Sequence, residues 1–462
     1  MSWYKALALV ASGAAALGMA QPSAIGADGV GDPYFPQDGN GGYDVSRYDV
    51  KVSYDPANPG SFTGDTTVHA AARQDLDRFD LDLEGFTVSA VTVNGVPAKA
   101  IARSGAHELV ITPRTRVRRG STFAVRVVYS GPPVGASRHR LVGGGIDVSG
   151  EPHSATAWFP LNDHPSDKAA LHLEATVPTG WTVVGNGLPG PTTTNAGHTT
   201  FRWHEDHPIV SYATTMAIDK FTVHTSKLAD GTPVITAYGQ NTSILPDSEA
   251  LLPKIMGFLT DTFGPYPFDS TGAIVVEPEA TEGSLALETQ TRPTYDGAFF
   301  DASAVHELAH QWFGDAVSFS DWRDGCLAEC FAQYAGQLWD EAENGADLDE
   351  SYRSIVEQNA GDAAYWQVPI YDPGKDRPLD YALYDRGSLM LHALRRTMGD
   401  DKFFGLLNHW ITAHRDGNAS WPDFEHFASA QAGQDLSGFF TAWAHSSVIP
   451  PARYLYPGSL AR

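Results

Sequence analysis

The sequence predicts an α+β fold of two domains, an all-β domain over residues 28–222 and a mainly helical domain over residues 223–462. Two observations support this division. Apolar and polar residues alternate in short runs up to about Phe221, as in half-buried strands, and from about Thr222 the apolar residues recur at helical spacing. A chain of 462 residues is also longer than a single hydrophobic core usually supports.

The N-terminus, residues 1–27, has the pattern of a secretory signal peptide. Lys5 gives a basic start, an apolar run follows over residues 6–20, and the small residues Ala20 and Ala27 suit cleavage. The apolar run is too short for a membrane span, although a permanent N-terminal anchor is the alternative. We therefore expect a secreted, extracellular protein.

Composition narrows the classes of function. Hydrophobic residues make up 42% and charged residues 19%, which is typical of a folded soluble protein rather than a disordered one. Removing the predicted signal deletes one lysine and no acid, so the formal net charge changes from −24 to −25. Such acidity argues against nucleic acid and anionic membranes as partners. No later stretch reaches the roughly 18 apolar residues of a membrane span.

The β domain is marked by alternation and by turn residues. Residues 43–54 and 123–129 include alternating apolar positions, and Asn94-Gly95 after the run 86–93 is a hairpin signal. Turn residues recur at short spacing, which is typical of a β-sandwich. Residues 28–42 are rich in Gly, Asp and Pro, and we expect them to form a lead-in to the first strand.

Helical periodicity dominates the second domain. Residues 247–263 predict an amphipathic helix and residues 272–278 a short Val-rich strand. A helix that begins near Asp301 is expected to end at Gly314, and a second amphipathic helix is expected over residues 324–344. The loop between these two helices lets the second fold back on the first.

The first of these two helices carries the zinc-binding pattern H-E-x-x-H over residues 306–310. On a helix, His306 and His310 lie one turn apart with Cβ atoms about 5–6 Å apart, so both imidazoles can bind one ion. Glu307 lies about 100° around the helix from His306, so its carboxylate is beside the ion rather than bound to it. Glu329 is the candidate third ligand, which leaves a fourth position for water. The alternative is a pair of core histidines with a chance glutamate between them.

Residues 306–314 followed by residues 322–334 resemble the H-E-x-x-H-x-W-F-G … W-L-N-E-G-F-A-x-Y signature of the aminopeptidase N family. These are zinc metallopeptidases, or gluzincins, whose relatives include leukotriene hydrolase. Residues 158–168 also resemble the family's W-F-P-C-x-D-x-P-x-x-K segment, in which we expect Asp163 and Lys168 to be structural. The resemblance implies a saddle-like N-terminal β domain, a thermolysin-like catalytic domain and one zinc ion per chain. We expect a short form, without the helical-repeat domain that follows in larger relatives.

Two further acids match family positions that contact the free amine of the substrate. Residues 283–290 are similar to the G-A-M-E-N motif, with Glu288 at the acid, and residues 149–151 lie where members carry Q-x-E, with Glu151 at the acid. A carboxylate at a fixed distance from the metal can accept charge-assisted hydrogen bonds from a protonated amine. For both residues the alternative is an ordinary solvated acid.

A tyrosine completes the implied site. Residues 384–387 resemble the family's Y-x-K-G pattern, ahead of a helix expected over residues 388–398. The resemblance implies that the Tyr384 hydroxyl points at the developing oxyanion. A preorganised donor at such a position lowers the barrier by about 2.7–4 kcal/mol. Tyr381 is the alternative donor, and a place in the core is the alternative role for Tyr384.

These residues predict a secreted zinc aminopeptidase that hydrolyses the N-terminal peptide bond of peptides. Zinc held by His306, His310 and Glu329 would activate a water, and Glu307 would move its proton. The first alternative is a thermolysin-like zinc endopeptidase, because the same metal pattern also serves enzymes that cut internal bonds. The second is a catalytically silent zinc-binding protein of the same fold, suggested by the departures from the family pattern on either side of Glu329.

Cys326 and Cys330 are the only cysteines. At positions i and i+4 of one helix their Cα atoms are within bridging range, but parallel Cβ directions suit the disulfide torsion poorly. We therefore expect two reduced, buried thiols that pack against the zinc helix. A thiolate that acts as an extra metal ligand is the alternative.

Overall fold

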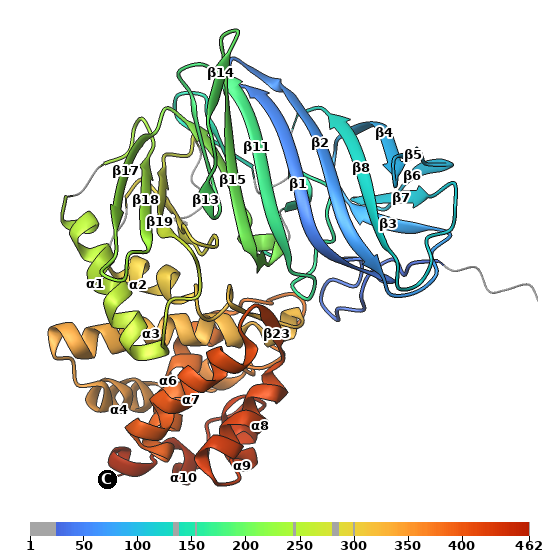
Figure 1. Cartoon of the computed structure of the whole chain (residues 1–462). Coiled ribbons are helices and arrows are strands. Elements are labelled where there is room, and N and C mark those ends of the chain that lie inside the picture. The colour runs from blue at the N-terminus through green and yellow to red at the C-terminus, as the bar shows by residue number, and fades with distance from the viewer. Residues whose placement is uncertain are drawn as a thin grey trace, which may run out of the picture.

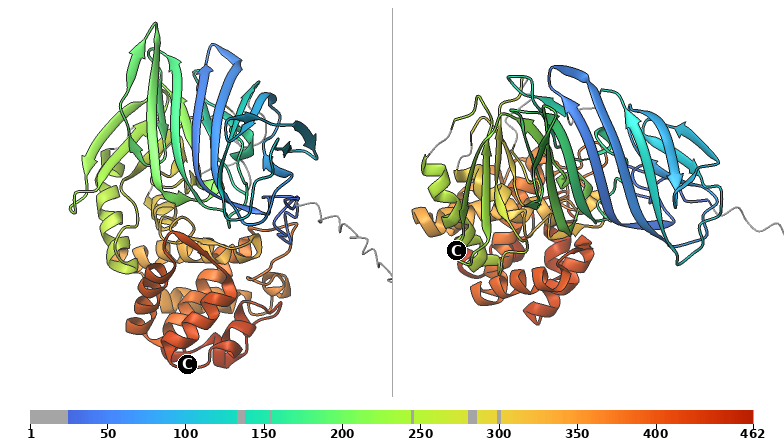
Figure 2. Two further views of the ribbon diagram at one scale, coloured as in Figure 1. Left: turned by 45° about the vertical axis from the view of Figure 1, so that its right-hand side comes forward. Right: turned by 45° about the horizontal axis from the view of Figure 1, so that its top comes forward.

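The computed structural model describes residues 25–132, 138–152, 155–243, 246–279, 286–298 and 301–461. Residues 1–24 of the predicted signal therefore lie outside the described residues. The predicted α+β class is confirmed. Figures 1 and 2 show β-sheets over the first part of the chain and helices α3 to α10 gathered below them.

The largest sheet runs through the N-terminal part of the chain. Its strands, in spatial order, are β13 (Leu188–Pro189), β15 (His198–Ile209), β11 (Ala169–Pro178), β1 (Tyr43–Asp55), β2 (Asn58–Ala72), β8 (Thr122–Ser130), β4 (Thr87–Val93) and β5 (Val96–Pro97), and β14 (Thr193–Asn195) pairs with β15. The pairing of β1 with β11 is parallel, whereas the other pairs of this sheet are antiparallel.

The predicted hairpin at Asn94-Gly95 is confirmed. These two residues connect β4 to β5, where Val93 pairs with Val96, and both have positive φ values, 51° and 75°. Positive φ at both central positions is what a type I′ turn requires, and Asn and Gly tolerate it best. The alternation of β1 is also confirmed, because Val45, Val50 and Val52 are buried.

Two smaller sheets complete this part of the chain. One contains β3 (Phe79–Asp82), β7 (Glu108–Thr112) and β6 (Ala100–Ser104), and the other contains β12 (Thr182–Gly185), β16 (Met216–Asp219), β10 (Ile146–Val148) and β9 (Arg138–Arg140). The sheet of β3, β7 and β6 is overlaid by residues 25–42, which we call the lead-in segment. Ile25 forms a bridge with Arg78 next to β3.

A five-stranded sheet then leads to the helices. Its order is β17 (Thr222–Lys227), β18 (Pro233–Tyr238), β19 (Thr271–Val276), β21 (Thr294–Asp296) and β20 (Ala286–Leu287). The helices are α1 (Pro246–Phe263), α2 (Asp301–Ala309), α3 (Cys326–Asn344), α4 (Leu348–Asn359), α5 (Ala363–Trp366), α6 (Tyr381–Met398), α7 (Asp400–His414), α8 (Trp421–Ala432), α9 (Ser437–Trp443) and α10 (Ala452–Leu455). Strands β22 (Val317–Phe319) and β23 (Gly417–Ala419) pair beside them.

Two predicted helix boundaries are wrong. Helix α2 ends at Ala309 rather than at Gly314, because the N–H groups of Gln311 and Trp312 bond to carbonyls only three residues back and tighten the chain into turns. Helix α6 begins at Tyr381 rather than at 388, because the Asp380 side chain caps its N-terminus.

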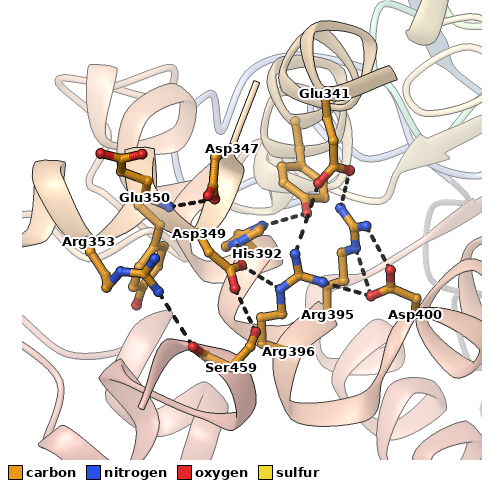
Figure 3. A network of polar contacts seen from close by, with 12 residues as sticks. Glu341, Asp347, Asp349, Glu350, Arg353, His392, Arg395, Arg396, Asp400 and Ser459 are labelled. Atoms are coloured by element: carbon orange, nitrogen blue, oxygen red, sulfur yellow. Dashed lines mark hydrogen bonds and ion pairs between the residues drawn. The ribbon is translucent and has the colours of Figure 1, made fainter. Parts of the chain in front are cut away.

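A network of charged residues holds α6 to its neighbours (Figure 3). Arg395 of α6 pairs with Glu341 of α3 and with Asp400 of α7, and Arg396 pairs with Asp349 of α4 and with Asp400. Among the described helices, none combines the length and apolar character that a membrane crossing requires.

Candidate metal centre and substrate pocket

The three predicted metal ligands meet between α2 and α3. His306 lies in the last turn of α2, His310 directly follows that helix, and Glu329 lies in the first turn of α3. The two Nε2 atoms are 3.1 Å apart, and Oε2 of Glu329 lies 3.3 Å from His306 Nε2 and 3.6 Å from His310 Nε2. Donors bound to a tetrahedral zinc ion at about 2.0–2.2 Å are about 3.3–3.6 Å apart, so the donor set fits zinc in chemistry and in spacing.

Hydrogen bonding prepares His310 as a ligand. Its Nδ1 lies 3.0 Å from the carbonyl oxygen of Phe313, and because a carbonyl only accepts, Nδ1 carries the proton. The lone pair of Nε2 therefore faces the other two donors, as in most metal-binding histidines. Phe313 in turn stacks on Phe331 of α3, with ring centroids 4.4 Å apart, which fixes the end of α2 against α3.

Burial and neighbouring charges shift the pKa values of Glu329 and Glu307 in opposite directions. Burial alone would raise the pKa of Glu329, but His310 and His306 hold it well below its usual value, so Glu329 stays ionised as a ligand must. Burial, and after it the charges of Glu288 and Glu329, raise the pKa of Glu307 well above its usual value against the opposing effect of His310. A raised pKa suits a group that takes up a proton.

Glu288, which follows β20, and Glu151, which follows β10, both line a cavity of about 310 Å³ beside the metal donors. Carboxylate oxygens of Glu151, Glu288 and Glu329 lie within 4.8 Å of one another. Among the described residues, Oε1 of Glu288 and Oε1 of Glu151 are buried and accept no hydrogen bond. Crowded, unsatisfied carboxylates at a cavity wall favour a cationic ligand such as a protonated amine. Residues 283–285 of the predicted motif lie outside the described residues.

Tyr384 lines the same cavity and stacks on His306, with ring centroids 6.0 Å apart. Tyr381, the alternative donor, is 77% exposed and does not line the cavity. Helix α6 can bring Tyr384 to this position because Gly387, one turn later, packs against Cys330 of α3 without a Cβ. Burial, and then the neighbouring carboxylates, raise the pKa of Tyr384 above its usual value, so its hydroxyl keeps the proton that a donor needs.

Sequence reasoning did not assign three polar residues that also line the cavity, Tyr295, Asp296 and Ser303. Tyr295 and Asp296 belong to β21, and Ser303 lies in the first turn of α2. No motif marks them. Their position in the strand and helix turn that immediately precede the H-E-x-x-H pattern was the one signal available.

The two cysteines form a disulfide, which corrects the expectation of two reduced thiols and excludes a thiolate ligand in this state. That expectation assumed a regular helix. Cα atoms four residues apart in a regular helix are separated by about 6.2 Å, whereas those of Cys326 and Cys330 are 4.8 Å apart. The pair opens α3 directly after a 3-10 turn, where the Ala328 N–H still bonds to the carbonyl of Gly325 three residues back, so the backbone departs from regular helix spacing.

Lys168 and Asp163 lie outside the cavity. The ammonium of Lys168 donates to the carbonyl oxygens of Asp315 and Ala316, at 2.5 and 3.2 Å. These carbonyls belong to the turn that follows His306 and His310. Lys168 therefore fastens the strand region of the chain to the loop behind the metal centre.

Comparison with known proteins agrees with this site. Residues 251–443 match the model of the Peptidase family M1 domain. The chain is 26% identical over 440 residues to Aminopeptidase N of Streptomyces lividans, covering 88% of this chain and 50% of that protein. It is 22% identical over 432 residues to Probable aminopeptidase 1 of Saccharolobus solfataricus, covering 86% of this chain and 53% of that protein.

A solved structure is similar along almost its full length. It is an M1 zinc metallopeptidase from Deinococcus radiodurans, a mutant bound to a Tyr-Ser-Ala substrate. The TM-score is 0.82 at 28% sequence identity, and the match covers 92% of this chain and 99% of that chain.

The fold and the donor set together define a two-domain protein of the H-E-x-x-H metallopeptidase class. Residues 251–443 match the M1 peptidase family, and the chain resembles aminopeptidase N proteins and M1 zinc metallopeptidases over most of its length, as the signature residues predicted. It spans about half the length of the curated relatives that it matches.

Proposed function

We propose that this protein is a zinc aminopeptidase that hydrolyses the N-terminal peptide bond of peptides. The observation that carries the proposal is the pair of buried, unsatisfied carboxylate oxygens of Glu288 and Glu151 beside a zinc-compatible donor set. An endopeptidase cleaves internal bonds, so it needs no carboxylates at one end of its cleft to bind a free amine. A clamp for a charged amine limits the substrate to chain ends.

His306, His310 and Glu329 would hold the zinc ion, which when bound supplies a Lewis acid for the peptide carbonyl and lowers the pKa of an attacking water. Glu307 takes the proton of that water and passes it to the departing nitrogen. The hydroxyl of Tyr384 donates a hydrogen bond to the carbonyl oxygen as negative charge develops there.

Glu288 and Glu151 position the substrate rather than react with it. Their carboxylates accept hydrogen bonds from the α-ammonium group and set the distance from the chain end to the metal. Only the first peptide bond then reaches the reacting groups. Peptides whose amine is acetylated lose the charge that these carboxylates bind.

The test is hydrolysis of free-amine aminoacyl reporter substrates beside their acetylated twins, with chelator and with zinc added back. We expect chelator-sensitive cleavage of the free-amine set alone. Cleavage of acetylated peptides at internal bonds would replace the proposal with a zinc endopeptidase. Turnover of neither set by zinc-loaded protein would identify a catalytically silent zinc-binding protein.

Variants separate binding of the amine from binding of the metal. Glu288→Gln should lower kcat/KM for free-amine substrates by about 10- to 150-fold, since a hydrogen bond to a charged group contributes about 1.5–3 kcal/mol. Its matched control is Glu277→Gln, which removes a carboxylate from the end of the same sheet but outside the cavity, and kcat/KM should not change. Glu329→Ala should lose the metal itself. Equal effects of the two Gln variants would contradict the amine-binding role.

We also propose that the protein is secreted, that residues 1–27 direct its export, and that each chain holds one zinc ion. Two cleavage sites suit the signal, after Ala20 and after Ala27. Cleavage after Ala20 is supported by hydrogen bonds that Gly26 and Ala27 share with Arg78 and Gly41, because cleavage after Ala27 would remove them. The intact mass of protein recovered from the culture medium distinguishes the two sites, and elemental analysis counts the zinc.

A further inference from the structure

The carboxylate of Glu288, the proposed amine ligand, is carried by a short segment that directly follows β20. We call residues 288–292 the anchor segment, and all five of them are buried. The β-rich part of the chain holds one side of this segment. The Gln290 N–H donates to the carbonyl oxygen of Ala213 at 3.0 Å, and the side-chain amide of Asn186 donates to the carbonyl oxygen of Gln290 at 2.8 Å. These bonds fix the backbone of the segment against the N-terminal part of the chain.

Gln311 holds the other side of the anchor segment. It directly follows His310, and its side chain is fully buried. Its Oε1 accepts from the backbone N–H of Thr291 at 2.6 Å. Its Nε2 donates to Oδ2 of Asp315 at 2.7 Å and lies 3.5 Å from the carbonyl oxygen of Glu288. Because a backbone N–H only donates, Oε1 rather than Nε2 must face Thr291, so the amide has one orientation.

The backbone of the anchor segment gives a second, independent indication that its position matters. Thr291 has a φ of 70°, in the left-handed region that a β-branched residue rarely adopts. Such a conformation persists only where the surroundings impose it, and it is found most often at functional sites. Here the Thr291 N–H is bonded to Gln311, and its hydroxyl accepts from the N–H of Gly187 at 2.9 Å.

We propose that Gln311 is a positioning residue that fixes the distance between the metal ligands and the carboxylate of Glu288. The inference rests on the proposed function, in which Glu288 binds the amine of the substrate. His310 and Gln311 are neighbours in the chain, so the side chain of Gln311 ties the anchor segment to the backbone of a metal ligand. The distance from the amine to the carbonyl that reacts at the metal is then set by the protein.

A fixed distance has a consequence for the substrates that the site accepts. In an α-aminoacyl group one carbon atom separates the amine from the carbonyl carbon, whereas a β-aminoacyl group has two. The additional C–C bond moves the amine by up to about 1.5 Å. A misplacement of about 1 Å lowers a rate by about 100-fold, so a rigid site should accept the α-amine and reject the β-amine.

The experiment compares an L-alanyl and a β-alanyl reporter amide with the same leaving group, hydrolysed by the full-length, zinc-loaded protein. The measured quantity is the ratio of the two kcat/KM values, in which the fraction of active protein cancels. Gln311→Met is the test variant, because methionine has a similar length and makes neither hydrogen bond. Gln290→Met is the matched control, since Gln290 is equally buried and its side-chain amide has no hydrogen bond among the described residues.

We expect the wild type to prefer the L-alanyl reporter by about 100-fold or more. Gln311→Met should reduce this ratio by roughly tenfold or more, because the anchor segment is then free to shift relative to the metal. It should retain zinc, since the bond of His310 Nδ1 to the Phe313 carbonyl does not involve Gln311. Its Tm should fall, because the Thr291 N–H loses its acceptor. Gln290→Met should keep the wild-type ratio.

A purely structural role of Gln311 would lower both kcat/KM values together and leave their ratio unchanged. Gln311→Asn provides a second test if the Met variant does not fold, because it keeps an amide but is one methylene too short to reach both segments. An unchanged ratio in a folded, zinc-loaded Gln311 variant would overturn this inference and leave the aminopeptidase proposal intact. A wild type that hydrolyses both reporters equally would also overturn it. A wild type that hydrolyses neither, or that cleaves acetylated peptides, would refute the aminopeptidase proposal and this inference with it.

Discussion

Gly387→Ala tests whether close packing of α6 on α3 sets the position of Tyr384. An added Cβ at position 387 would overlap Sγ of Cys330 and lie 2.9 Å from its Cβ. Carbon atoms in ordinary contact are about 3.5–4.0 Å apart, so the two helices must separate by about 1 Å. Rotation of the sulfur out of the way is prevented because it is bonded to Cys326.

The separation has two measurable costs. Overpacking of this size lowers the free energy of unfolding by about 1–3 kcal/mol. Tyr384 lies one turn before Gly387 on α6 and moves with it, and a displacement of about 1 Å at a reacting group lowers the rate by about 100-fold. Zinc content should not change, because no proposed ligand lies on α6.

The assay compares kcat/KM for a free-amine reporter, bound zinc and Tm in the variant and in a matched control. Gly336→Ala on α3 is that control, since no atom lies within 4 Å of its added Cβ. It should raise stability by about 0.5–1 kcal/mol and leave kcat/KM unchanged. Gly387→Ala with wild-type activity and stability would refute the argument that this contact positions Tyr384.

Three further predictions follow from other parts of the molecule. Burial and neighbouring arginines lower the pKa of His392 from 6.5 to about 4, so its stabilising contribution is complete above pH 6.5 and is lost as the pH falls toward 4. Between pH 8 and pH 5 the wild type should lose about 2 kcal/mol more than His392→Gln, measured by urea unfolding. His409→Gln, an exposed control, should follow the wild type, and parallel pH profiles of all three proteins would contradict this pKa. Thiol titration in denaturant should detect no thiol before reduction and two after it, whereas two at the outset would restore the reduced pair Cys326 and Cys330. Glu307→Gln should keep zinc but lose about 10²–10⁴ in kcat, and near-native turnover would exclude Glu307 as the base.

The part of the site that could be predicted from residue spacing alone is the part built on one helix turn. His306 and His310 are neighbours because helical geometry makes them so, and Glu307 follows from the same geometry. Glu288, Glu151 and Tyr384 could be assigned through resemblance only, because each reaches the cavity from a separate element. The prediction of these residues as members of one pocket agrees with the cavity that they line.

Features set by contacts between distant segments escaped prediction. The burial of Asp82 is one case, since nothing in its local pattern indicates that Asn40 of the lead-in segment will lie against it and donate a hydrogen bond to it. The disulfide is another, because a tightened first turn of α3 is a tertiary effect and not a helix propensity. A third case is the end of α2 at Ala309. The apolar stripe continues to Phe313, but the chain forms turns around His310 instead of continuing the helix.

The parallel pairing of β1 with β11 bears on how the chain reaches its fold. Strand β1 can pair early with its hairpin neighbour β2. Its other edge stays unpaired until β11, which lies more than a hundred residues later in the chain, packs against it. Closing a loop of that length loses conformational entropy before the stabilising strand contacts form. The large sheet should therefore form slowly compared with the local helix pairs of the C-terminal part. Until β11 arrives, an interior strand of the finished protein has an open edge that can pair with another chain. Refolding yield should therefore fall as protein concentration rises.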